Sequence, residues 1–223
     1  MTDGNSQKIC TIDENSECSR CELQGKLRCK FNRKDTAKFA TYVIPFFFSG
    51  FFGMCLTGIV TGNWFFLIGY LSFLILFFTL IESRILCRHC PYYAKPGRSL
   101  KCYANEGFPK IWRYEPKPMN RIEKMSFIIC IFLFGSFPIF TELYGIWYLS
   151  INYASYGLIA FLGFLGITIA TSLAVFAWII GLNLSFCSSC INFSCPFNKV
   201  PKKIVEPYLE KNPTLKNAWL GPN

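Results

Sequence analysis

The sequence predicts an all-α integral membrane protein, a four-helix transmembrane bundle of two hairpins with a Cys-rich, metal-stapled cytoplasmic region. Three observations predict this fold class. The chain contains four long apolar runs, its Lys and Arg residues all lie on one side of those runs, and ten of its twelve cysteines lie on that same side. Hydrophobic residues make up 52% of the 223 residues and aromatic residues 18%, a composition that argues against a water-soluble domain.

Each apolar run is close to the roughly 20 residues that a helix needs to cross about 30 Å of hydrocarbon. Helices are expected because lipid offers no hydrogen-bond partner to an open strand edge. Short turns at 61–63 and 150–155 are expected to join the runs into two antiparallel hairpins. The expected spans are residues 39–60, 64–86, 126–149 and 156–186.

The distribution of basic residues predicts the topology. Segments 1–38, 82–125 and 187–223 hold 8, 10 and 5 of the 23 Lys and Arg residues, and the two short turns hold none. The positive-inside rule therefore places both termini and the long loop in the cytoplasm of a multi-pass cell-membrane protein. The net charge of +10 then favours anionic lipid headgroups as partners of the basic face, and nucleic acid is disfavoured beside transmembrane helices.

This topology divides the chain into five segments. No signal peptide is expected, because the first 38 residues are polar and charged, so the first span itself would direct insertion. The expected segments are a cytoplasmic Cys-rich N-terminal segment (1–38), transmembrane hairpin 1 (39–86), a cytoplasmic Cys-rich basic loop (87–125), transmembrane hairpin 2 (126–186) and a cytoplasmic Cys-rich tail (187–223).

Ten cysteines outside the spans form the candidate site. Cys55 and Cys130 fall inside spans, where a free thiol behaves as a small apolar group. The others form three triads, each opening with C-x-x-C, and one further cysteine. A C-x-x-C turn lets two thiolates hold one metal ion, whereas stable disulfides are not expected in a reducing cytosol. The predicted metal ligands are Cys10, Cys18, Cys21, Cys29, Cys87, Cys90, Cys102, Cys187, Cys190 and Cys195.

The spacing leaves the grouping of these ligands and the metal open. The four N-terminal cysteines could form one site, and the other six a second site or a two-metal cluster; alternatively the three triads mix. Zinc and an iron–sulfur cluster both accept four thiolates. Cys-Pro at 90–91 and 195–196 is typical of ferredoxin-type runs, but the tight C-x2-C-x2-C run is missing, which favours zinc slightly. His89 directly precedes Cys90 in the chain, so the two side chains cannot easily bind the same metal ion.

Three charged residues, Glu142, Glu82 and Arg84, lie inside the predicted spans or at their ends. Glu142 is the only acid outside the cytoplasmic segments and their borders. A carboxylate buried in lipid is a functional candidate, but Glu142 lies about 24 Å past Ser126 along a helix, which predicts a place near the outer interface. Glu82 and Arg84 are expected to form an interfacial pair. The aromatic and basic stretch 110–119 is expected to lie among lipid headgroups.

Small residues and tail prolines predict packing. Stripes in the first and fourth spans favour close packing within one bundle over a dimerisation face. The stripes consist of Ser49, Gly53 and Thr57, and of Gly163, Ala170, Ala174, Ala177 and Gly181. Pro201 and Pro213 suit the first turns of two short helices whose apolar sides would cover the metal-bound region.

These features favour a binding protein over an enzyme of ordinary design. The sequence has no Walker A loop, no H-E-x-x-H and no G-x-S-x-G, and it has a single histidine. The leading hypothesis is a zinc-stabilised scaffold or accessory subunit that recruits a cytoplasmic protein partner. The alternatives are an iron–sulfur membrane redox subunit that passes electrons to a lipid-soluble acceptor, and a reversible thiol redox sensor.

Overall fold

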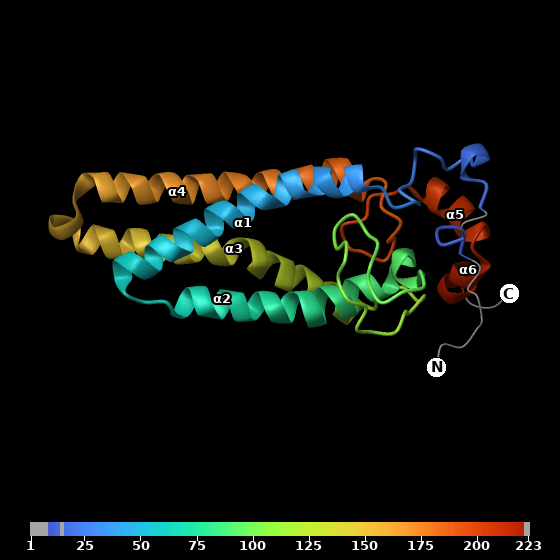
Figure 1. Cartoon of the computed structure of the whole chain (residues 1–223), viewed down its shortest axis with the longest axis horizontal. Coiled ribbons are helices and arrows are strands. Elements are labelled where there is room, and N and C mark those ends of the chain that lie inside the picture. Colours follow the sequence, from blue (N-terminus) through green and yellow to red (C-terminus); the bar gives the residue numbers. More distant parts are fainter. Residues whose placement is uncertain (1–8, 14–15, 221–223) are drawn as a thin grey trace. The chain divides into compact units, whose positions relative to one another are not determined.

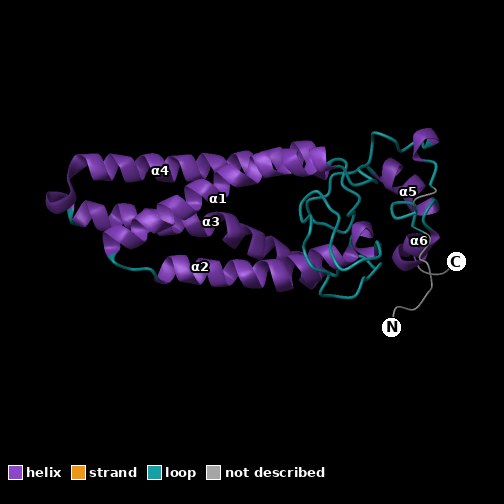
Figure 2. Cartoon of the chain, viewed as in Figure 1, coloured by secondary structure: helices purple, strands orange, loops and turns teal. Residues whose placement is uncertain are grey.

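Four long helices dominate the structure, a computed structural model that describes residues 9–13 and 16–220. By length and composition, four helical segments can cross a membrane, which confirms the predicted number of spans and makes the chain a multi-pass membrane protein. No strand occurs among the described residues (Figure 2). The long helices are α1 (Arg33–Thr61), α2 (Phe65–Leu76), α3 (Arg121–Ile151) and α4 (Tyr153–Leu182) (Figure 1).

Two of these helices continue in other helical forms up to a C-x-x-C pair. After α2 the chain forms a π-helical segment, Phe77–Leu86, and a 3-10 turn, Cys87–His89. After α4 it forms a shorter π-helical segment, Asn183–Cys187. Cys87 therefore directly follows a continuous helical segment, and Cys187 is the last residue of another. Each C-x-x-C pair begins where such a helical segment ends.

Glycines in the left-handed region mark the turns between the long helices. Gly62 has φ +70° and follows α1, and Gly157 has φ +74° within the first turns of α4. Only glycine adopts this conformation without a steric cost from Cβ. Asn152 alone separates α3 from α4, so α3 runs slightly further than the sequence predicted.

Two compact units make up the chain. The helical unit consists of Lys38–Phe78 and Ile128–Leu182. The cysteine unit consists of the described residues of Met1–Ala37, Thr79–Phe127 and Asn183–Asn223. It carries two further helices, α5 (Lys202–Glu210) and α6 (Pro213–Leu220); α6 begins at Pro213 as predicted, whereas Pro201 is the N-cap residue that directly precedes α5.

An aromatic core joins the helices of the helical unit. Phe46 of α1 stacks on Trp178 of α4 at 5.5 Å between ring centroids, and Phe134 of α3 lies 5.4 Å from both rings. Tyr70 of α2 donates a hydrogen bond to the backbone oxygen of Phe134 at 2.9 Å. The outer faces of these helices carry exposed large apolar side chains, which lipid can solvate.

The predicted packing stripe of α4 is wrong for three of its five members, whereas Gly181 is buried and Ala174 is half-buried. Gly163, Ala170 and Ala177 are exposed, and a Cβ at Gly163 would meet no atom within 4 Å. Larger side chains occupy the face towards α1 and α3 instead, where Trp178 packs on Phe46 and Phe134. The buried face of α4 consists of Phe164, Thr168, Thr171, Val175, Trp178 and Gly181. On α1, by contrast, Gly53 and Thr57 are buried as expected.

The cysteine unit has its own apolar core, built from three separate segments. Ile9, Leu23 and Leu27 of the N-terminal segment pack with Tyr92 of the basic loop. The tail supplies buried residues to the same core, so the apolar sides of α5 and α6 cover it, as the sequence predicted. These tail residues are Ile191, Tyr208, Leu209 and Leu215.

Candidate functional site

Tight backbone turns hold the C-x-x-C pairs of the cysteine unit. The amide of Cys21 donates to the backbone oxygen of Cys18 at 3.3 Å. The amide of Cys90 donates in the same way to Cys87 at 2.9 Å. Each turn keeps its two cysteines on one short loop, and the apolar core then decides which loops become neighbours.

The four N-terminal cysteines form one neighbourhood, here called the N-terminal thiol group: Cys10, Cys18, Cys21 and Cys29. Burial and, to a smaller extent, the thiols of the other three members together raise the pKa of Cys29 to about 12. Two tail side chains also reach these sulfurs. Asn212 Nδ2 donates to Cys10 Sγ at 3.3 Å, and Lys211 Nζ donates to Cys21 Sγ at 3.8 Å.

The remaining six cysteines of the cysteine unit form a second neighbourhood, the six-thiol group. Cys90 interacts electrostatically with Cys102, Cys190 and Cys87. Cys195 interacts with Cys190 and Cys187, which connects the two halves of the group. Cys87 also lies within electrostatic range of Cys102 and Cys195. The members, from the loop and the tail, are Cys87, Cys90, Cys102, Cys187, Cys190 and Cys195.

Backbone amides donate hydrogen bonds to four sulfurs of the six-thiol group. The donors are Tyr92 for Cys90, Ala104 and Asn105 for Cys102, Asn192 for Cys190, and Phe197 and Asn198 for Cys195. Each donor lies two or three residues after its cysteine, so the chain curls around the sulfur. Such donors favour a negatively charged sulfur, the form that binds a metal.

While no metal is bound, burial has a larger effect on the pKa of these thiols than the amide donors have. It raises the pKa of Cys102 and of Cys195 to about 12, and it raises the pKa of Cys90 and Cys190 above the ordinary thiol value. At neutral pH these groups are therefore thiols, and a bound metal would have to displace their protons.

Three side chains beside the six-thiol group were not predicted from the sequence. The Tyr103 hydroxyl donates to the sulfur of Cys190. Asn105 Nδ2 lies 2.8 Å from Glu82 Oε1 and 3.5 Å from Cys87 Sγ, so one amide group bridges a carboxylate and a thiol. No spacing rule marks these positions, because their role depends on how the loop folds back.

The expected ion pair between Glu82 and Arg84 is wrong. Glu82 is bonded to Asn105, and the guanidinium of Arg84 lies 5.1 Å above the ring of Trp112. Residues two apart on a helix do not face each other, which explains the difference. The Trp112 indole also donates to the backbone oxygen of Thr79 at 3.0 Å. The headgroup location expected for stretch 110–119 stays a prediction.

Arg28 ties the N-terminal segment to the tail between the two thiol groups. Its Nη2 donates to the backbone oxygen of Ser185 at 3.0 Å, and its Nε donates to Ser189 Oγ at 3.1 Å. The guanidinium also pairs with Asp35 and lies 4.7 Å above the Phe186 ring. The Tyr92 hydroxyl donates to the backbone oxygen of Arg28. One side chain thus connects segments that carry Cys29, Cys90, Cys187 and Cys190.

His89 has partners at both ring nitrogens. Nδ1 lies 2.7 Å from the backbone oxygen of Lys117, which can only accept, so Nδ1 carries the proton. Nε2 accepts from Arg88 Nε at 3.3 Å. Arg88 also pairs with Glu123 at 2.9 Å. His89 therefore positions the loop, and the donor set of the candidate site consists of sulfur.

All twelve cysteines carry free thiols. Within residues 9–13 and 16–220, no group of three or more His, Cys, Asp or Glu side chains has the arrangement needed to hold one metal ion. The thiols of each group are thus neighbours without forming a coordination sphere. Metal binding by the predicted ligands stays a prediction.

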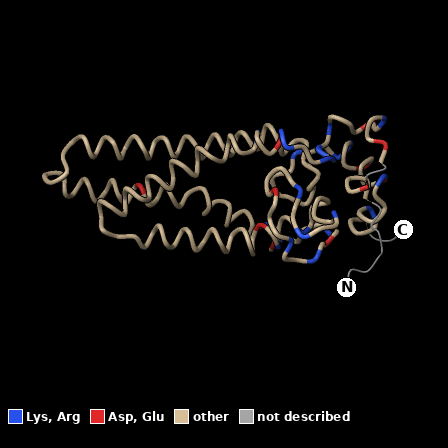
Figure 3. Tube along the Cα trace, in the orientation of Figure 1, with Lys and Arg blue, Asp and Glu red and all other residues tan. Residues whose placement is uncertain are grey.

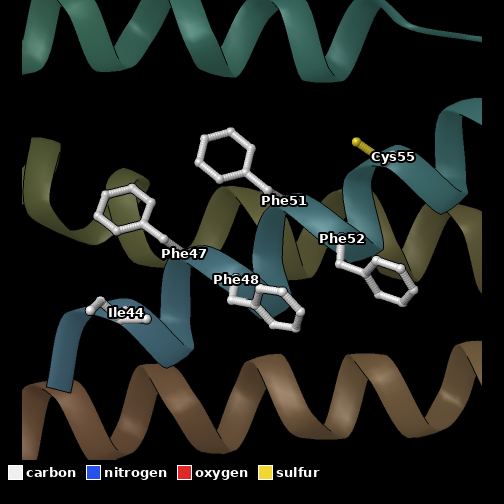
Figure 4. Close-up of a pocket in the computed structure, with 6 residues that line it drawn as sticks. All are labelled: Ile44, Phe47, Phe48, Phe51, Phe52 and Cys55. Atoms are coloured by element: carbon white, nitrogen blue, oxygen red, sulfur yellow. The ribbon is translucent and has the colours of Figure 1, made fainter. Parts of the chain in front are cut away.

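A hollow lies in the helical unit, along α1. It has a volume of about 480 Å³ and is lined only by apolar side chains (Figure 4). Without a polar group it offers no anchor for a headgroup or a quinone carbonyl. Its lining consists of Ile44, Phe47, Phe48, Phe51, Phe52 and Cys55.

Comparisons with protein-family models, with curated proteins and with solved structures find no match to this chain.

Proposed function

We propose that this protein is a membrane-anchored, Cys-ligated metal-binding scaffold or accessory subunit, most simply one stabilised by zinc. One observation carries the proposal: ten thiols from three separate segments lie in two neighbouring groups of one compact unit. Four soft donors suffice for one tetrahedral zinc ion, and the six-thiol group has donors for one ion or for a bridged pair.

Backbone amides aimed at sulfur support this proposal. A structural metal site needs outer donors that stabilise its thiolates, and four sulfurs of the six-thiol group already have them. On this proposal, metal binding draws neighbouring thiols into a coordination sphere and so joins the N-terminal segment, the loop and the tail. The joined face would then present a rigid surface to a cytoplasmic protein partner.

An iron–sulfur centre is the second candidate function. Amide donors to sulfur and a cluster buried in apolar surroundings also suit iron–sulfur ligation, and both Cys-Pro pairs, at 90–91 and 195–196, belong to the six-thiol group. Such a centre would make the protein a membrane redox subunit that passes electrons to a lipid-soluble acceptor. A thiol sensor is disfavoured, because sensor cysteines are exposed and have low pKa values.

The proposal includes the membrane arrangement. α1 with α2, and α3 with α4, would form two hairpins whose short turns lie outside the cell membrane. Both termini and the loop would be cytoplasmic, since every Lys and Arg lies there, and the basic face would contact anionic lipid headgroups.

Anaerobic purification separates the candidates. The visible spectrum, the bound metal and the acid-labile sulfide of the detergent-solubilised protein would be measured together. Colourless protein with stoichiometric zinc supports the scaffold, and brown protein with iron and sulfide supports the redox subunit. Protein without metal, with all ten thiols alkylated after mild unfolding, would contradict both.

A matched pair of variants tests the ligands. Cys90→Ser should lower the metal content and the melting temperature together, because it removes a buried donor of the six-thiol group. Cys130→Ser is the control, since Cys130 lies within a span and outside both groups; it should leave the metal content unchanged. Equal metal content in the two variants would count against a ligand role for Cys90.

A further inference from the structure

Glu142 is the only acidic residue of the helical unit, and it is completely buried. Lys38 and Glu142 are the only two charged residues in the unit, as the nearly uncharged long helices in Figure 3 illustrate. The relative exposure of Glu142 is 0%. It lies in α3 nine residues before Ile151, about 14 Å from that end of the helix.

Polar and small residues of α1 and α4 enclose this carboxyl group. Thr171 Oγ1 of α4 donates to Glu142 Oε1 at 2.8 Å. On α1, a Cβ at Gly53 would lie 2.1 Å from the same oxygen, so only glycine admits the carboxyl. The Thr57 hydroxyl of α1 is also buried. It lies 2.9 Å from the backbone oxygen of Gly53 and 3.4 Å from that of Thr141. The hydroxyl groups of Thr171 and Thr168 on α4 therefore reach the carboxyl group, and Gly53 of α1 lies against it.

The other carboxyl oxygen has no protein partner. Glu142 Oε2 is buried and makes no hydrogen bond to any residue that the structure describes. The neighbouring residues on α1 and α4 have no titratable side chain. They are Gly53, Thr57, Thr168 and Thr171. Lys38 precedes Gly53 by 15 residues, about 22 Å along α1, too far to form an ion pair. Glu142 thus has no basic side chain of the helical unit within ion-pair distance.

A bare carboxylate in this place would be strongly unfavourable, because neither water nor a protein cation compensates its charge. Its charge must be balanced by a small cation from outside the chain. A proton on Oε2 achieves this, and so does a sodium ion, since hard monovalent cations prefer carboxylate, hydroxyl and backbone oxygens.

We propose that Glu142 is an intramembrane binding site for a small exchangeable cation, a proton or a sodium ion, held between Gly53 of α1 and Thr171 of α4. The site lies in the helical unit and is independent of metal binding in the cysteine unit. Exchange of the cation would alter the contact of α3 with α1 and α4, because all three helices meet at the carboxyl.

Infrared difference spectroscopy of the full-length protein in lipid would test this site. The carbonyl stretch of the protonated acid would be recorded while the medium changes from low to high pH in choline chloride, and then with sodium chloride at constant pH. Loss of the acid band at high pH alone assigns a proton site. Loss on adding sodium assigns a site shared with sodium. An acid or carboxylate signal that responds to neither change overturns the proposal.

Variants assign the signal to Glu142. Glu142→Gln should abolish the band, whereas Glu210→Gln, at an exposed position of α5, should retain it. Thr171→Val should shift the midpoint of the exchange about tenfold or more, because it removes the hydroxyl that binds Oε1. Ser172→Ala, whose hydroxyl bonds the backbone of Thr168 instead, is its control. An unchanged midpoint in Thr171→Val would refute the assigned geometry.

Gly53→Ala provides an independent check that does not rely on the acid itself. The added methyl group must displace the carboxyl, so the melting temperature should fall and the response to sodium or pH should weaken. Gly163→Ala is the matched control, because its Cβ would meet open space. Similar behaviour of the two variants would show that the contact between Gly53 and Glu142 is absent.

Discussion

Single residues set the chemistry of both candidate sites through burial. Cys102 and Cys195 lie among apolar neighbours, and the resulting penalty on a charged thiolate raises the pKa of each to about 12. Amide donors to the same sulfurs act in the opposite direction. The balance makes these residues inert thiols at neutral pH and good ligands only when a cation replaces their protons.

The pH dependence of stability follows from these two residues. Their pKa in the fold is raised above 9.0, so the folded state holds protons that the unfolded chain loses. The stabilisation is fully present below about pH 9 and is lost as the pH rises towards 12. The free energy of unfolding of metal-depleted, reduced protein should therefore fall between pH 9 and pH 11, as measured by denaturant titration in detergent.

A double variant controls for other groups that titrate in this range. Replacing Cys102 and Cys195 by Ala should flatten the decrease, because Tyr and Lys residues then contribute alone. A decrease of the same slope in the double variant would contradict the raised pKa values.

At the scale of elements, the tail helices act as a cover for the other Cys-bearing segments. Asn212, between α5 and α6, is fully buried. Its side chain accepts from the Cys10 amide at 2.7 Å and donates to Cys10 Sγ. The Tyr208 hydroxyl and Thr11 Oγ1 lie 2.8 Å apart. The N-terminal segment therefore depends on α5 and α6 for polar as well as apolar contacts.

Removing this cover should release the N-terminal segment. A chain that ends at Val200 would expose Ile9, Leu23 and Leu27, which lose their contacts with Tyr208, Leu209 and Leu215. Protease should then cleave within residues 9–31 at a much higher rate, while cleavage within the spans stays unchanged. Mass spectrometry of the fragments measures both. Equal protection of residues 9–31 in the two chains would show that the tail does not cover them.

A matched point variant refines this result. Asn212→Ala removes one buried and two partly buried hydrogen bonds and should destabilise the cysteine unit by about 1–3 kcal/mol. Glu210→Ala, exposed on α5, should have little effect. Thermal unfolding of the full-length variants compares the two.

At the scale of the whole molecule, the chain divides into an apolar, nearly uncharged unit and a charged unit that is rich in cysteine. The helical unit has two charged residues, and the remaining charges belong to segments that also carry ten cysteines. This separation suits a protein that is anchored by one part and binds ligands with the other. It also makes the compartment of the cysteines the central question about the molecule.

Thiol labelling of oriented vesicles answers that question. A membrane-impermeant maleimide should label the chain in inside-out vesicles and leave it unlabelled in right-side-out vesicles, because the partly exposed thiols of the cysteine unit belong to the same segments as the basic residues. Chelator treatment should increase the labelling if a metal protects the thiols. Labelling from the outer side would reverse the topology, and the cysteines would then face an oxidising compartment.

Several features of this molecule could be predicted from the sequence because they are local. Hydropathy over about 20 residues depends only on composition, so the four spans were predicted with small errors at their ends. The apolar sides of α5 and α6 were predicted from periodicity for the same reason. The candidate ligands were found from C-x-x-C spacing, which is also a local signal.

Only the tertiary structure decided how each helix is rotated and which thiols are neighbours. Gly163, Ala170 and Ala177 were predicted to pack against another helix, yet they are exposed, and the aromatic core lies on the opposite face of α4. Glu142 was predicted near an interface from its distance along the helix, and the contact with Gly53 enclosed it. Rotation and enclosure depend on contacts between residues far apart in the chain, which no local pattern contains. The sequence alone therefore determined that this is a four-span, cysteine-rich membrane protein, and packing decided where its chemistry lies.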